Sequence, residues 1–167
     1  MTRLYKLLVS QMRQKIALYN ELIPLFQEEW DSIVDYSLDE VRAVLKKKEI
    51  LALKMQMLEE NRLKVVAEIA NHLGVDPENL TLRDIIKVCG RPLSTQLTAQ
   101  RETLLSQISA IFDYSEKNKH LVNRSSLSIK KSLVFLHRTQ DSAEAAYGAD
   151  GHRGEGKALC RMLSTEV

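Results

Sequence analysis

The sequence predicts an all-α protein, an elongated antiparallel helical hairpin or coiled coil followed by a short helical connector and a long C-terminal helix. Composition is the first indication, because only 5% of the 167 residues are aromatic and the chain holds only six glycines and three prolines. Such a composition is typical of long helices. The second is apolar residues that recur in alternating steps of three and four, the spacing of a coiled-coil seam. The length suits a single domain with its own core, which we place at residues 1–150.

The first arm of the predicted hairpin covers residues 2–36. Pro24 falls inside this arm, where it removes a backbone donor and crowds the preceding turn. We therefore expect a kink near Glu21 to Ile23. The apolar seam of the arm is Met12, Ile16, Tyr19, Ile23, Phe26, Trp30 and Ile33.

The second arm covers residues 38–73. At its start, Ser37 can cap a backbone amide and Glu40, three residues on, can reach back toward it. Lys48 and Arg62 place cations at inward positions of its seam. Such cations either lower stability and help to fix the register, or extend past the seam so that their charges reach water. The full seam is Val41, Val44, Lys48, Leu51, Met55, Leu58, Arg62, Val65 and Ile69.

A structured connector is expected over residues 74–92. Gly74 is a helix stop, and Asp76-Pro77 restarts a turn with proline at the first helical position. The segment Thr81-Leu82-Arg83-Asp84 resembles another helix cap. The connector ends at Gly90-Arg91-Pro92.

The last helix is predicted over residues 94–147, with Ser94 or Thr95 as its cap. In the middle of its seam, polar residues replace apolar ones, and each lost apolar contact costs roughly 1 kcal/mol or more. We expect this section to be locally unstable or to await another surface, and a flexible tail to follow over residues 151–167. The seam is Leu97, Leu104, Ile108, Ile111, Ser115, Asn118, Val122, Ser125, Ile129, Leu133, Leu136, Gln140, Ala143 and Tyr147.

Charge and hydropathy argue against nucleic acid or a membrane as the main partner. The formal net charge is +2, and the tight basic runs Lys46-Lys47-Lys48 and Lys130-Lys131 have no aromatic platform between them. No apolar run approaches the roughly 18 residues of a membrane span, and no apolar signal core follows Met1. We expect a cytoplasmic protein without membrane insertion.

No metal, cofactor or catalytic site is predicted. Cys89 and Cys160 lie far apart without metal-ligand spacing, and the four histidines are scattered along the chain, so neither a zinc site nor a disulfide is indicated. The glycines from Gly148 onward follow a helix rather than a strand, unlike a phosphate loop. Because no nucleophile, base and orienting group suggest themselves, we do not expect an enzyme.

Tyr147 ends the last seam directly before Gly148. It is in register with Leu133 and Leu136, but its last-turn neighbours are alanines, which cannot enclose a phenol ring. An under-packed aromatic residue beside a glycine indicates a docking residue.

Three segments resemble the FlgN-like flagellar type III export chaperones. Met1-Thr2-Arg3-Leu4 is similar to the start of some members, and Asn118-Lys119-His120-Leu121-Val122 resembles the family's asparagine followed three residues on by an aliphatic pair. Tyr147-Gly148-Ala149-Asp150-Gly151 resembles the family's ending before a glycine-rich basic tail.

The resemblance implies a cytosolic chaperone for the hook-filament junction proteins FlgK and FlgL, which delivers them to the export gate component FlhA. A structural coiled-coil adaptor without chaperone activity fits the heptads equally well, but predicts a stable rod that is insensitive to short peptides. The client-binding residues that the resemblance implies are Asn118, Leu121, Val122, Ile129, Leu133 and Leu136. The implied gate-docking residues are Tyr147, Gly148, Asp150 and Gly151.

Overall fold

The computed structural model describes the backbone of residues 1–146 and the side chains of residues 1–138, and the structural statements below concern these residues. They form helices and turns without a strand, so the all-α prediction is confirmed. Two compact units divide the chain, Met1–Val122 and Asn123–Val167, and each is described by itself. A single domain at 1–150 stays a prediction. The helices are α1 (Thr2–Val34), α2 (Leu38–Leu73), α3 (Leu82–Val88) and α4 (Leu93–Ala146).

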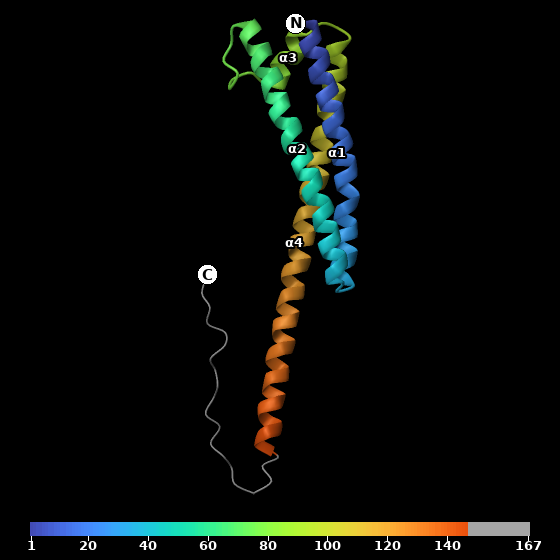
Figure 1. Ribbon diagram of the computed structural model, residues 1–167, viewed down its shortest axis with the longest axis vertical. Coiled ribbons are helices and arrows are strands. Elements are labelled where there is room, and N and C mark those ends of the chain that lie inside the picture. The colour runs from blue at the N-terminus through green and yellow to red at the C-terminus, as the bar shows by residue number, and fades with distance from the viewer. Residues whose placement is uncertain (147–167) are drawn as a thin grey trace. The chain divides into compact units, whose positions relative to one another are not determined.

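Helices α1 and α2 lie side by side as an antiparallel hairpin (Figure 1). Two ion pairs show their register. Lys15 Nζ lies 2.9 Å from a Glu59 oxygen, and Lys47 Nζ lies 2.8 Å from a Glu28 oxygen. Residue numbers therefore fall along α2 as they rise along α1. Helix α1 continues through Pro24 from Thr2 to Val34, and the kink expected beside this proline stays a prediction.

The turn between α1 and α2 differs from the predicted cap. Tyr36 adopts a left-handed φ of 55°, and Ser37 occupies the N-cap position without a side-chain capping hydrogen bond. The backbone amide of Ser37 instead donates to the carbonyl oxygen of Ser32 at 3.0 Å. The predicted Ser37–Glu40 capping box is therefore wrong, because backbone hydrogen bonds close this turn.

The main apolar core of the first unit joins all four helices. Leu8 of α1, Ile69 of α2, Ile85 of α3 and Leu97 of α4 are all fully buried. A helix as short as α3 is not stable alone, so its packing in this core holds it in place. Burial in α1 begins at Tyr5, earlier than the predicted seam, because α3 and α4 cover this end of the hairpin.

The connector contains two of the predicted signals. Gly74 ends α2 with a left-handed φ of 69°, a conformation that favours glycine. Thr81 and Asp84 form a complete capping box at the start of α3. Pro77 lies in a turn rather than at the start of a helix, so that part of the prediction is wrong.

Helix α4 begins earlier than its predicted caps. The amides of Leu93 and Ser94 donate to the carbonyl oxygen of Gly90 at 3.1 and 3.4 Å. These bonds start the helix at Leu93. Ser94 and Thr95 therefore lie in the first turn, and the prediction that one of them caps the helix is wrong.

Within the first unit, α4 runs alongside α1 in the same direction (Figure 1). The side-chain amide of Gln100 donates to the carbonyl oxygen of Val9 at 3.1 Å, and that of Gln107 donates to the carbonyl oxygen of Ile16 at 3.1 Å. Both pairs are 91 residues apart in the sequence. The separation stays constant because the two helices run in the same direction. Side-chain amides thus align α4 on the backbone of α1.

Candidate functional site

Near the hairpin turn, polar side chains from three helices meet. Asn118 of α4 donates to the carbonyl oxygen of Phe26 at 2.8 Å and to Oε2 of Glu29 at 2.6 Å. Lys48 of α2 donates to the same Glu29 oxygen at 2.6 Å, and its ammonium lies 3.6 Å from the centre of the Phe26 ring. We call these four residues the polar junction. The apolar cluster between α1 and α2 in this region is small: Leu25, Val44 and Leu51.

The junction corrects the interpretation of Asn118. Its side chain is 4% exposed, and the two bonds to α1 use both hydrogens of its amide. Asn118 therefore does not await another surface, because it already holds α4 against α1. Its side chain faces the bundle and is not presented to a partner.

Lys48 is a paired cation inside the seam. The side chains of Lys48 and Glu29 are 16% and 14% exposed, so the charges neutralise each other away from most of the solvent. Buried polar groups of this kind favour one register, because any shift leaves a charge or an amide unpaired. Lys48 therefore does not extend past the seam into water, which was the second alternative for the inward cations. Its effect on stability and register stays a prediction.

Arg62, the second inward cation, forms an ion cluster across the hairpin. Its Nε lies 3.0 Å from both carboxylate oxygens of Glu59, which also accepts a hydrogen bond from Lys15 at 2.9 Å. The hydrogen bonds from Arg62 lower the pKa of Glu59 to about 2, aided by Lys15 and opposed by partial burial. These charges lie at the edge of the core and link α1 to α2.

Two of the predicted client-binding residues lie at the end of the first unit. Leu121 is half-buried and Val122 is exposed. Both are on α4, within four residues of Asn118. The exposed side chain of Val122 is available to a partner, whereas that of Asn118 is not.

The predicted client-binding residues of the second unit are exposed. Ile129, Leu133 and Leu136 are 50%, 59% and 59% exposed, and their spacing of four and three places them on one side of α4. We call this set the client face. Every side chain from Ser126 to Arg138 is exposed. Clustered apolar exposure of this kind is typical of interaction surfaces.

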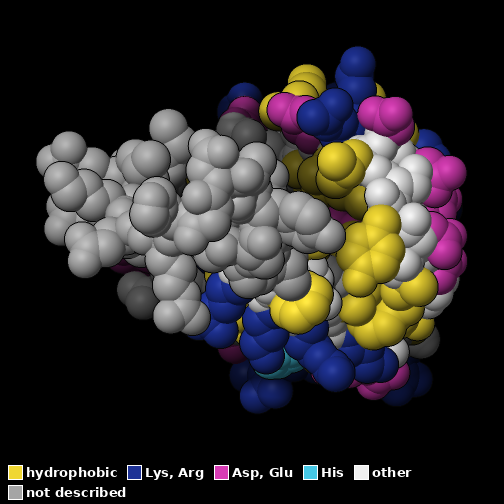
Figure 2. All heavy atoms as spheres, turned by 90° about the horizontal axis from the view of Figure 1, so that it is seen from below, with side chains coloured by type: hydrophobic (Ala, Val, Ile, Leu, Met, Phe, Trp, Pro, Cys, Tyr) yellow, Lys and Arg dark blue, Asp and Glu magenta, His cyan; other side chains and the backbone are white. Residues whose placement is uncertain are grey.

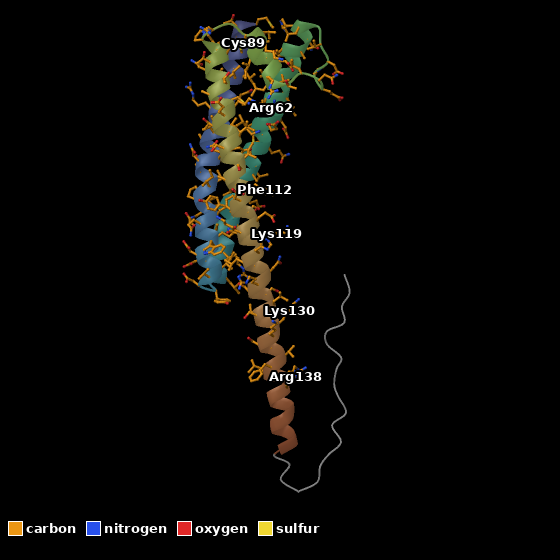
Figure 3. The ribbon with its side chains drawn as sticks, turned by 180° about the vertical axis from the view of Figure 1, so that it is seen from behind. Arg62, Cys89, Phe112, Lys119, Lys130 and Arg138 are labelled. Atoms are coloured by element: carbon orange, nitrogen blue, oxygen red, sulfur yellow. The ribbon has the colours of Figure 1, made fainter. Side chains whose placement is uncertain are left out.

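A second set of exposed apolar residues on the same part of α4 was missed by the sequence reasoning. Leu127, Val134 and Phe135 are all exposed, and they line a shallow hollow of about 350 Å³ together with three cations. The cations are Lys130, Lys131 and Arg138, of which Lys130 and Arg138 are labelled in Figure 3. The seven-residue spacing of Leu127 and Val134 was a visible signal, but a single seam had been assigned to this helix.

The predicted gate-docking residues lie outside the described residues. This holds for Tyr147, Gly148, Asp150 and Gly151, and for the tail expected over 151–167.

Three further kinds of chemistry concern the described residues: metal binding, membrane insertion and thiol reactivity. No group of His, Cys, Asp or Glu side chains in this part of the chain could hold a metal ion. None of its helices is both long and apolar enough to cross a bilayer. Cys89 is buried beside α3, and burial raises the pKa of its thiol, which disfavours the reactive thiolate.

Comparison with known proteins gives one match. The family model described as FlgN protein matches residues 1–154. No curated protein and no solved structure matches the chain. The matched residues include all four helices and both exposed faces of α4. The chain therefore belongs to the FlgN family, a family of flagellar export chaperones.

Proposed function

We propose that this chain is a cytoplasmic chaperone that binds the C-terminal helical segments of the junction proteins FlgK and FlgL, keeps them unassembled, and delivers them to the export gate protein FlhA. Membership of the FlgN family supports the general role. The observation that carries the specific proposal is the client face, where Ile129 and Leu133 are exposed on one side of a helix.

The client face has the spacing that helix-in-groove recognition uses. An amphipathic client helix with apolar anchors at i, i+3 or i+4, and i+7 covers such a stripe. Ile129 and Leu133 are each at least half exposed, so covering one of them contributes about 1 kcal/mol. Burial of the client's own apolar anchors adds to this gain, and ordering a disordered client tail opposes it by several kcal/mol. The resulting moderate affinity permits release at the gate without a nucleotide.

The first unit serves as a folded scaffold whose polar groups are used internally. Asn118 belongs to the polar junction, so the proposal does not include it among the client contacts. Leu121 and Val122 remain predicted client contacts of the first unit.

Docking to FlhA is assigned to Tyr147, Gly148, Asp150 and Gly151. The proposal rests on the resemblance of this segment to the family's ending and on the position of the tyrosine beside a glycine. Replacing Tyr147 with alanine should weaken docking to the cytoplasmic domain of FlhA and leave capture of a client tail unchanged.

Titration calorimetry with C-terminal peptides of FlgK and FlgL tests the client face. Leu133→Ala with Leu136→Ala should weaken binding about tenfold or more, because two apolar anchors are truncated. The matched control is Leu53→Ala with Leu63→Ala, which truncates two exposed leucines of α2 and should change affinity less than about twofold.

Two results would contradict the proposal. Equal affinities for the client-face and control variants would remove the site assignment. Failure of the unaltered chain to bind either tail would favour the structural coiled-coil adaptor.

A further inference from the structure

A heptad row of cations lies on the side of α4 opposite the client face. Arg124, Lys131 and Arg138 recur every seven residues, and Leu127 and Val134 alternate with them in steps of three and four. A helix turns about 100° per residue, so these five residues share one side of it. We call them the basic heptad face.

The basic heptad face has the pattern of a coiled-coil seam. One inward position is apolar and the other is basic, whereas an uninterrupted seam is apolar at both. All five side chains are exposed. Seen from below, the surface of the described residues has Lys and Arg side chains next to hydrophobic ones, in a view that labels no residue (Figure 2). A solvated helix face does not need leucine and valine between its charges.

The Lys and Arg side chains on this part of α4 have no acidic residues among them. Between Asn123 and Arg138 the sequence has no Asp or Glu, and among the described residues no ion pair involves Lys130, Lys131 or Arg138. An uncharged helix docked here would bury part of these cations without compensation, which is unfavourable. A helix with carboxylates opposite them would bury Leu127 and Val134 while pairing the charges.

We propose that the basic heptad face binds an amphipathic helix of a protein partner that carries acidic residues at heptad spacing beside apolar anchors. This inference rests on the proposed client-binding function. The client segment that covers the basic heptad face is then one with acidic residues along its apolar seam. The client face and the basic heptad face then take two helical segments on opposite sides of α4.

Two designed peptides of 21 residues test this with the full chain. Both peptides carry leucine at one of the two inward heptad positions. At the other inward position and at the flanking positions, the first peptide has glutamate and the second has lysine. The unaltered chain should bind the glutamate peptide about tenfold or more tightly than the lysine peptide in fluorescence anisotropy. The preference should weaken as salt rises.

Charge reversal is the decisive variant. Arg124→Glu, Lys131→Glu and Arg138→Glu together should invert the preference so that the lysine peptide binds more tightly. The control is Lys46→Glu, Lys54→Glu and Lys64→Glu, three exposed positions of α2 with the same change in net charge, and it should keep the original preference.

Several outcomes would overturn the proposal. The first is equal binding of both peptides by the unaltered chain, and the second is inversion by the α2 control as well, which would show an effect of net charge alone. The third is a DNA duplex that displaces the glutamate peptide as effectively as unlabelled peptide does, which would make the face a polyanion site.

The result separates this inference from the proposed function. Suppose that capture of FlgK and FlgL tails depends on Leu133 while charge reversal changes neither tail capture nor peptide preference. The proposed function then stands and only the acidic-helix inference fails. If neither set of variants changes tail capture, both fail.

Discussion

The polar junction predicts a strong energetic coupling between Glu29 and Lys48. Their carboxylate and ammonium are 2.6 Å apart and both side chains are largely buried. A neighbouring pair, Glu28 and Lys47, offers a matched control. It joins the same two helices at 2.8 Å, but its side chains are 46% and 57% exposed. The two pairs therefore differ in burial, and the buried pair also contacts Asn118 and the Phe26 ring.

The magnitude follows from that difference in burial. Removing one partner of a buried ion pair costs about 3–5 kcal/mol, because the other charge is left uncompensated. Glu29→Ala should fall in this range, since it strands Lys48 and also removes an acceptor of Asn118. Once Lys48 is changed to methionine, removing Glu29 costs less, and we expect a coupling energy of about 2 kcal/mol. For Glu28 and Lys47 the expected coupling is about 0.2–1 kcal/mol.

Urea unfolding at pH 7, followed by circular dichroism, measures both double-mutant cycles. The single and double variants of each pair give the coupling energy as the deviation from additivity in the free energy of unfolding. Raising salt to 1 M should reduce the coupling of the exposed pair in proportion more than that of the buried pair. Equal coupling energies in the two cycles, or additivity at Glu29 and Lys48, would refute the argument that burial strengthens the Glu29–Lys48 pair and so favours this register of the helices.

Three further predictions concern the first unit. The folded-state pKa of Glu59, about 2, lies below its ordinary value of 4.5, so between these two pH values the unfolded chain binds more protons than the folded chain. The stabilisation from Glu59 is therefore complete above about pH 4.5 and is lost as the pH falls toward 2. Glu59 is 37% exposed, so after discounting for solvent screening it contributes about 1 kcal/mol, and acid titration of Glu59→Gln should lack this phase. Gly74→Ala should destabilise the chain by about 1 kcal/mol or more, since its φ is +69° with open space around a Cβ, and Gly90→Ala, with open space but no positive φ, should cost less. Thr81→Ala removes a capping box and should cost about 1 kcal/mol in thermal unfolding, whereas an unchanged midpoint would show that α3 depends on its packing alone.

Most helical segments could be predicted because their signals are local. The heptad seams, the stop at Gly74 and the cap at Thr81 each depend on residues within a few turns of one another. The caps at Ser37 and Ser94 were wrong for a related reason. A serine at a helix start permits a side-chain cap, but the backbone bonds of the adjoining turn decide whether it forms.

The candidate site was predictable only in part. Ile129 and Leu133 were assigned to binding from the resemblance, and the structure shows both exposed. Asn118 was assigned to binding in the same way, and in the sequence it is a polar residue within an apolar seam. Its partners Phe26 and Glu29 are about 90 residues away, so no local pattern could distinguish an amide that awaits a partner from one already bonded to α1.

The sequence alone therefore determined the helical class, the hairpin and the approximate limits of the long helices, because periodicity, glycine and proline act over a few residues. Only the tertiary structure decided which inward polar groups are satisfied inside the bundle and which apolar residues of α4 are left uncovered. The physical reason is that burial and hydrogen bonding depend on the neighbours that each side chain meets in space. Asn118 and Lys48 meet α1, whereas Ile129, Leu133 and the basic heptad face remain at the surface.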